Sequence, residues 1–346
     1  MSNLIDLLAA NRSDLARAIA ETHFDRHPEL RERYGAAGLA HCTSDAAYHL
    51  QYLEQALRVR NDELFADYAR WAKIMLEARH IPAADLSSNL ATVADVVGEK
   101  IPALAANVRQ TIDAGLRALE AVVEAHDARQ PHAELAEAYL RAVLAGDRKV
   151  ASRLVTDAIS SGVSLHDVYL HVFQSTQHEI GRLWQRNEIG VADEHLATAI
   201  TQMVMSQLYP MLFSGPRRQR TFVSACVGGE LHEIGARMVA DFFEMDGWKT
   251  YYLGANTPVS GIVKMICERK ADIAGISVTI SFNLDAAKQV IHAIREEMGC
   301  RDTKVIVGGY PFAVAPELWK TIGADGYAAN ASEAILLAER LLGERA

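Results

Sequence analysis

Apolar side chains recur every three or four positions through residues 1–127, which is the spacing of one face of an α-helix. Leu50, Leu53 and Leu57 form one such stripe. Helix ends are expected where proline or glycine interrupts the backbone hydrogen bonds, at Pro28, 34–38, 80–82 and Pro102. The pattern therefore predicts an N-terminal domain built only of helices.

Residues 132–213 continue the helical spacing after a polar stretch at 125–131. Short breaks that contain glycine and polar residues divide this region at 145–147, 161–164 and 187–190. Four helices with short connections pack most simply as an antiparallel bundle, so a four-helix bundle is expected here.

The pattern changes at Thr221 to short β-rich runs that alternate with amphipathic helices. Strands are expected at 221–227, 250–253, 273–278, 304–307 and 326–328, and helices near 234–245, 259–270, 285–298, 317–321 and 332–342. Such alternation predicts a parallel sheet covered on both faces, with ligands at the carboxyl ends of the strands. The expected fold class is multi-domain α plus α/β: an all-helical domain of globin-like size at 1–127, the four-helix bundle at 132–213 and a doubly wound, flavodoxin-like domain at 221–346.

Composition narrows the classes of partner. The 346 residues include 35 Lys and Arg against 44 Asp and Glu, and a net charge of -9 disfavours nucleic acid as a partner. No apolar run is long enough to cross a membrane and the N-terminus has no signal-peptide pattern, so a cytoplasmic location is expected. The four cysteines form no CxxC pair and are expected to be separate thiols, at Cys42, Cys226, Cys267 and Cys300.

The loop after the first strand, 228–235, carries the clearest candidate chemistry. It contains neither G-x-G-x-x-G nor a glycine-rich loop ending in Gly-Lys-Ser/Thr, but it places Glu230 two residues before His232 and Gly235 three residues after it. An imidazole can bind a metal through one nitrogen while its other N–H bonds a carboxylate. Gly235 would let a bulky group pass close to the next helix. Taken alone, so short a pattern is more typical of a capping loop with a solvated histidine.

Further residues fall at the same edge of the expected sheet: Ser277 and Thr279 after the third strand, and Gly308 and Gly309 after the fourth. With these, residues 133–342 resemble the cobalamin-binding unit of methionine synthase, corrinoid methyltransfer proteins, carbon-skeleton mutases and cobalamin photoreceptors, in which a helical bundle caps the α/β domain. We therefore name residues 132–213 the cap. The resemblance implies that His232 is the lower cobalt ligand and that the other four residues line the slot for the nucleotide tail.

The sequence departs from the commonest form of this motif at two positions. Glu230 stands where aspartate is usual, and Thr279 stands where leucine is frequent. Neither change removes the metal ligand. A self-contained mutase or methionine synthase also needs a substrate barrel of typically ~250 residues, for which no segment remains.

The cap carries a W-x9-E-H pattern, formed by Trp184, Glu194 and His195. This pattern resembles the cobalamin photoreceptors and implies an aromatic cover and a polar pair around an upper adenosyl group. Gln185 departs from the light-responsive repressor of that family, which has histidine there. The alternative is that Trp184 packs between helices and the Glu-His pair only charges the start of a helix.

The order of domains resembles the photocobilins, which hold the linear tetrapyrrole biliverdin beside cobalamin. The resemblance rests on architecture and the shared motifs. Candidate wall and carboxylate-binding residues for such a pigment are Tyr48, His49, Tyr52, Arg70, Trp71 and His80, although core packing explains their spacing equally well.

These observations favour a light sensor with adenosylcobalamin, and biliverdin as a second chromophore, that signals through conformation or oligomeric state rather than by turnover. It would act as a homo-oligomer or through a protein partner. The first alternative is a corrinoid methyl carrier of a methyltransferase system. The second is a cobalamin-responsive regulator that ignores light and binds a protein partner.

Overall fold

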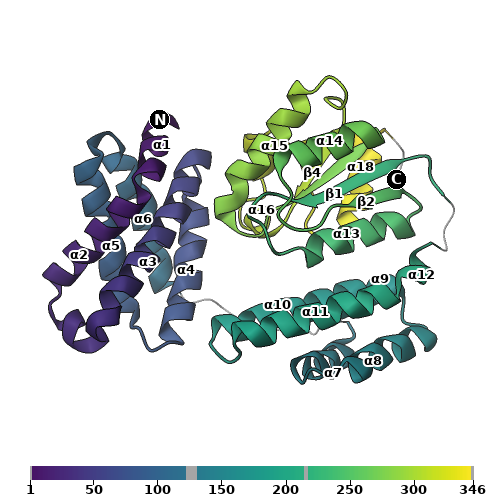
Figure 1. Ribbon diagram of the computed structural model, residues 1–346, viewed down its shortest axis with the longest axis horizontal. Coiled ribbons are helices and arrows are strands. Elements are labelled where there is room, and N and C mark those ends of the chain that lie inside the picture. Colours follow the sequence, from purple (N-terminus) through teal and green to yellow (C-terminus); the bar gives the residue numbers. More distant parts are fainter. Residues whose placement is uncertain (1, 122–130, 214–216, 344–346) are drawn as a thin grey trace. The chain divides into compact units, whose positions relative to one another are not determined.

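The computed structural model describes residues 2–121, 131–213 and 217–343 (Figure 1). The chain forms two compact units. The first contains the N-terminal residues together with 280–285 and 310–322, and the second contains the cap and the rest of the α/β domain. The expected end of the N-terminal domain at residue 127 lies outside the described residues.

The N-terminal part of the first unit is helical, as expected. Its helices are α1 (Ser2–Ala10), α2 (Arg12–Arg26), α3 (Glu29–Val59), α4 (Asp62–Glu77), α5 (Ala83–Lys100), the short 3-10 turn η1 (Pro102–Leu104) and α6 (Ala105–Glu120). The break expected at 34–38 is a kink inside α3, where Gly35 adopts φ 62°. Glycine absorbs this left-handed conformation without the steric cost of a side chain, so the chain bends and the helix resumes.

Two segments of the α/β sequence belong to the first unit. They hold η3 (Ser281–Asn283), α16 (Tyr310–Val314) and α17 (Leu318–Ile322). The Phe282 ring lies edge-on to Tyr52, with centroids 5.6 Å apart, and the Tyr310 hydroxyl donates to Asp67 at 3.1 Å. Because α16 is one short turn, its sequence carried no periodic signal and the sequence analysis missed it.

The cap is the expected four-helix bundle. Its helices are α7 (Ala133–Leu144), α8 (Arg148–Ser160), a continuous third helix made of α9 (Leu165–Asp167), the π-helical stretch η2 (Val168–Phe173) and α10 (Gln174–Gln185), then α11 (Val191–Gln207), followed by the single turn α12 (Tyr209–Leu212). Polar caps begin two of the helices, since the side chain of Asp147 accepts from the backbone of α8 and that of Ser164 accepts from the backbone of α9.

The α/β domain has five parallel strands in the order β2-β1-β3-β4-β5, which confirms the doubly wound fold class. The strands are β1 (Thr221–Cys226), β2 (Lys249–Tyr252), β3 (Ile273–Ser277), β4 (Lys304–Gly308) and β5 (Gly326–Tyr327). Figure 1 shows α13 (Ile234–Met245) on one face of the sheet, with α14 (Val259–Arg269) and α15 (Leu284–Glu296) on the other, and α18 (Ala331–Leu341) contacts α13. The strand order reverses between β1 and β3, so the β1 loop lies at the switch point where such folds bind ligands.

The cap packs on α13 through a shared apolar core. Phe242 of α13 lies 5.9 Å from Tyr169 of η2, ring centroid to ring centroid, and the Tyr169 hydroxyl donates to the buried Asp241 at 2.8 Å. Burial raises the pKa of Asp241 to about 6. The cap and α13 are therefore joined by an apolar contact that contains the buried carboxyl group of Asp241.

The expectation of four separate thiols is wrong for Cys267 and Cys300, which form a disulfide with Cα atoms 4.9 Å apart. The pair joins the end of α14 to the segment before β4, and a separation of 33 positions along the chain hid this proximity from the sequence. Cys42 and Cys226 are free thiols, and burial raises their pKa values to about 11 and about 12. None of the described helices is both long and apolar enough to span a membrane.

Candidate functional site

The loop between β1 and α13 presents one exposed histidine on a buried carboxylate. Glu230 is fully buried, whereas 58% of the His232 side chain is exposed. Oε1 of Glu230 accepts from Nδ1 of His232 at 2.6 Å and from its backbone N at 3.0 Å, and Oε2 accepts from the backbone N of Thr279 at 2.8 Å. The carboxylate therefore orients the imidazole and ties the β1 loop to the end of β3.

This arrangement indicates which nitrogen of the imidazole carries the proton and which is available to a ligand. The hydrogen bond that His232 donates to the Glu230 carboxylate raises the pKa of the imidazole, and burial opposes this rise. A proton held on Nδ1 by the carboxylate leaves the lone pair on Nε2, to which no described residue bonds. The site can thus offer one nitrogen ligand of increased basicity to a metal.

The loop after β2 is hydrogen-bonded to the histidine loop and stabilises it. Asn256, in the left-handed conformation at φ 49°, accepts from the backbone N of Gly229 at 2.8 Å and donates its own backbone N to the carbonyl of Glu230 at 2.9 Å. The sequence analysis missed this residue. Its signal was an asparagine in a Gly-Ala-Asn-Thr-Pro loop, since asparagine tolerates positive φ better than most residues.

The ends of β3 and β4 meet beside this loop. Ser277 pairs in register with Gly308, and the backbone N of Val278 donates to the Gly308 carbonyl at 3.0 Å. At Gly309, φ is 112° and a Cβ atom would lie 1.8 Å from the Val278 carbonyl oxygen. The polypeptide itself therefore requires glycine at 309. Through the bond from Thr279 to Glu230, this edge is continuous with the histidine loop.

Gly235 differs from Gly309, because no atom lies within 4 Å of the position that a Cβ of residue 235 would occupy. The same holds at Gly228. Nothing in the polypeptide excludes a side chain at either position. Leu231, next to the histidine, exposes 70% of its surface. The loop therefore offers three features to a ligand: an imidazole nitrogen, an exposed apolar side chain and open space. These features fit a broad, flat group whose metal already has ligands in the plane of that group.

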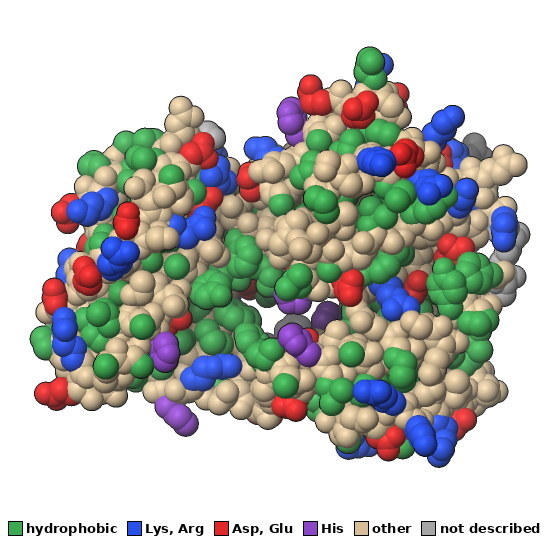
Figure 2. Space-filling view, in the orientation of Figure 1, with side chains coloured by type: hydrophobic (Ala, Val, Ile, Leu, Met, Phe, Trp, Pro, Cys, Tyr) green, Lys and Arg blue, Asp and Glu red, His purple; other side chains and the backbone are tan. Residues whose placement is uncertain are grey.

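The structure places the three cap residues at the ends of neighbouring helices. Trp184 is half-buried near the end of α10, and Glu194 and His195 lie in the first turn of α11 with Oε2 and Nε2 3.3 Å apart. The negative charge of Glu194 makes a small contribution to the raised pKa of His232, after the larger effect of Glu230. Figure 2 shows an opening between the cap and the α/β domain with histidine side chains on its rim.

Three of the six candidate pigment residues surround Tyr68 in the helical core. His49 is buried with Nδ1 2.8 Å from the Tyr68 hydroxyl, Tyr52 stacks on the Tyr68 ring at 3.7 Å, and Trp71 lies at 6.4 Å. Burial lowers the pKa of His49 to about 4, so it is neutral near pH 7. This is an aromatic packing cluster.

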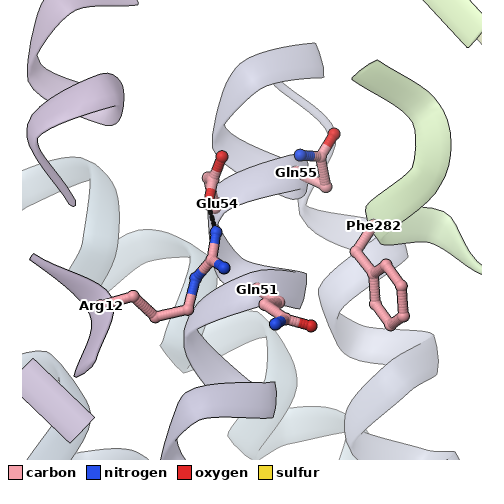
Figure 3. Close-up of a pocket in the computed structure, with 5 residues that line it drawn as sticks. All are labelled: Arg12, Gln51, Glu54, Gln55 and Phe282. Atoms are coloured by element: carbon pink, nitrogen blue, oxygen red, sulfur yellow. Dashed lines mark hydrogen bonds and ion pairs between the residues drawn. The ribbon is translucent and has the colours of Figure 1, made fainter. Parts of the chain in front are cut away.

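The other three lie apart from that cluster. Tyr48 is 54% exposed, Arg70 donates to Glu63 at 2.6 Å, and His80 sits in a left-handed turn at φ 62°. Figure 3 shows a pocket of the first unit that none of the six residues lines; its walls are Arg12, Gln51, Glu54, Gln55 and Phe282, with Arg12 paired to Glu54.

Comparisons with known proteins agree with the geometry of the histidine loop. Two family models, each described as a B12 binding domain, match residues 220–336 and 135–209. A dimethylamine corrinoid protein of Methanosarcina barkeri is 34% identical over 170 residues, which cover 48% of this chain and 78% of that protein. This chain belongs to the cobalamin-binding corrinoid protein family.

One further relative of this chain and one solved structure agree with this assignment. A corrinoid protein of Desulfitobacterium hafniense (strain Y51) is 27% identical over 210 residues, covering 59% of this chain and 95% of the relative. The solved structure of the monomethylamine corrinoid protein of Methanosarcina barkeri has the same fold, with a TM-score of 0.54 at 21% identity over 61% of this chain and 100% of that chain.

The light-sensor interpretation of Trp184, Glu194 and His195 is wrong. These residues lie inside the second matched B12 model, and the curated relatives described above are named corrinoid proteins. An aromatic residue and a Glu-His pair at adjoining helix ends thus fit a cap on cobalamin without deciding what occupies the upper side of cobalt. The biliverdin interpretation, which rested on the same photoreceptor resemblance, falls with it.

Proposed function

We propose that this chain is a corrinoid methyl carrier, which binds cobalamin and passes a methyl group between partner methyltransferases. One observation carries the proposal: the buried Glu230 carboxylate leaves Nε2 of the exposed His232 available as a single metal ligand. The names of the Methanosarcina relatives, dimethylamine corrinoid proteins, support the class of reaction. A methylated amine is accordingly the first methyl donor to test.

A bound cobalamin supplies a cobalt atom that can accept a methyl group and release it again. In this proposal His232 provides the lower ligand through Nε2, and Glu230 holds the proton on Nδ1, so that the ring does not turn and Nε2 stays basic. The remaining site residues fall into two groups. Gly235, Ser277, Thr279, Gly308 and Gly309 would line the ring and the nucleotide tail, and Trp184, Glu194 and His195 would face the upper side.

The proposal assigns a methyl group to the upper side in place of the adenosyl group that the photoreceptor resemblance implied. A carrier has to present that side to other proteins, so the cap has to move during its cycle. We therefore propose functional domains at 132–213 and 221–346 for the cofactor, with residues 1–127 as a further helical module.

The first test is His232→Ala in the full-length chain. We expect the variant to bind hydroxocobalamin at least tenfold more weakly, because imidazole is the strong ligand of this loop, or to hold it with the spectrum of the free cofactor. His292→Ala, at an exposed histidine of α15, is the matched control and should bind like the wild type. An unchanged affinity and spectrum for His232→Ala would rule out this ligand.

The second test addresses methyl transfer. Cobalamin-loaded protein, reduced with titanium(III) citrate and given isotope-labelled methyl iodide, should retain about one label per cobalamin and release it to a thiol acceptor when a partner methyltransferase is added. A protein that retains no label, or that binds adenosylcobalamin far more tightly than methylcobalamin, is not a methyl carrier.

A further inference from the structure

A second carboxylate follows the histidine directly and joins three parts of the second unit. Oε2 of Glu233 accepts from the Tyr252 hydroxyl of β2 at 2.9 Å and from the backbone N of Ala255 at 3.1 Å. Its Oε1 accepts from Nε2 of Gln202, on cap helix α11, at 2.7 Å. Glu233 occupies the N-cap position of α13, where its side chain makes no hydrogen bond to the backbone of that helix. Donors from the sheet, from the β2 loop and from the cap therefore converge on one side chain adjacent to His232.

A second attachment lies one turn further along both helices. Arg237 of α13 donates to Oγ of Ser206 at 2.9 Å and to the carbonyl of Gln202 at 3.3 Å. Gln202 and Ser206 are four residues apart and so share one face of α11. The cap helix is thus attached by polar contacts to the first turns of α13, immediately after the histidine.

The same helix carries Glu194 in its first turn. Gln202 lies eight residues further on, which is about 12 Å along an α-helix. The middle of α11 therefore holds Glu233, about 12 Å along the helix from the turn that carries Glu194. Because a helix moves as a rigid rod on this scale, a shift of the cap has to change the contact between Gln202 and Glu233.

We propose that Glu233 is a positioning residue that couples the position of the cap to the axial histidine. With the cap in place, Gln202 completes the hydrogen bonds of the carboxylate, and the backbone of 232–233 is held against Tyr252 and Ala255. When α11 moves away, Oε1 loses its donor, the carboxylate turns towards water, and the restraint on His232 weakens. This inference rests on the proposed role of His232 as the cobalt ligand.

The size of the coupling follows from the bonds that carry it. A hydrogen bond to a charged group changes an equilibrium by about tenfold or more when one partner is removed. Loss of Gln202 should therefore raise the ratio of protein with His232 off the cobalt to protein with His232 on the cobalt by about tenfold. This sensitivity would let the state of the cap adjust the strength of the lower ligand during methyl transfer.

The test uses the cobalamin-loaded full chain with Gln202→Ala, Glu233→Gln and the double variant. Gln207→Ala is the matched control, since Gln207 also lies on α11 but bonds to Ser152 within the cap. Electron paramagnetic resonance of the reduced, paramagnetic cofactor reports the fraction that carries an axial nitrogen. Hydrogen exchange at the first turn of α13 reports the restraint on the loop.

Both single variants should lower the axial-nitrogen fraction and speed exchange at α13, and the double variant should add nothing to the larger single effect, because both changes break the same contact. Gln207→Ala should behave like the wild type. Strictly additive effects, or an unchanged axial fraction in Gln202→Ala while His232→Ala abolishes the nitrogen signal, overturn the inference alone. A nitrogen signal that survives His232→Ala overturns the proposed cobalt ligand, and this inference with it.

Discussion

Substitution of Gly235 separates what the polypeptide needs at this position from what the cofactor needs. Gly235 is exposed in the first turn of α13, and a Cβ atom there would meet nothing within 4 Å. Alanine favours a helix over glycine by up to about 1 kcal/mol. Gly235→Ala should therefore leave the cofactor-free protein as stable as the wild type or more stable by up to about 1 kcal/mol. Gly235→Leu, whose side chain enters open space, should also fold.

The affinity for cobalamin should respond to these substitutions in the opposite direction to the stability of the cofactor-free protein. If the flat ring of cobalamin passes over this glycine, the leucine side chain occupies its place, and affinity should fall at least tenfold, which is about 1.4 kcal/mol. Urea unfolding of the cofactor-free variants measures the first effect, and titration with hydroxocobalamin followed by visible absorption measures the second. Gly261→Leu, in the first turn of α14, is the control and should keep wild-type affinity. Undiminished affinity in Gly235→Leu would refute the placement of the ring, and a large loss of stability would refute the open space.

Two further predictions concern the packing around the site. The raised pKa of Asp241 means that the folded protein binds this proton more tightly than the unfolded chain, so the free energy of unfolding should fall as pH rises from about 4 to 6. Asp241→Asn should remove that decline and be more stable than the wild type at pH 7 by at most about 3 kcal/mol in urea unfolding. Equal pH profiles for the two proteins would contradict the assignment. Gly309→Ala should cost more than about 3 kcal/mol of unfolding free energy, because its Cβ would overlap the Val278 carbonyl at positive φ; a variant with wild-type thermal stability would show that β3 and β4 do not approach so closely.

The local pattern of the sequence was sufficient for the elements and the fold class. The helix expected at 234–245 is observed as Ile234–Met245, and the five expected strands are observed within two residues of their predicted bounds. Periodicity succeeds here because each helix or strand must turn one apolar face to the core, which is a property of neighbouring residues. The short loop around His232 could be found for a similar reason, since the carboxylate, the imidazole and the glycine lie within six residues.

The W-x9-E-H pattern was a weaker guide. It locates the ends of two cap helices that lie inside a matched B12 binding domain, and it says nothing about the group above the cobalt. The evidence against the photoreceptor interpretation came instead from relatives named corrinoid proteins, matched over 210 and 170 residues.

Only the tertiary structure decided the contacts that join distant segments. Gln202 reaches Glu233 across 31 residues, Cys267 meets Cys300 across 33, and Tyr68 gathers His49 and Tyr52 into one aromatic cluster. A hydrophobic pattern determines which face of an element is buried, but the partner on the other side depends on the packing angle and register of whole elements. Those quantities are set by the assembled core, so the contact between Gln202 of the cap and Glu233 of the histidine loop is visible only in the folded chain.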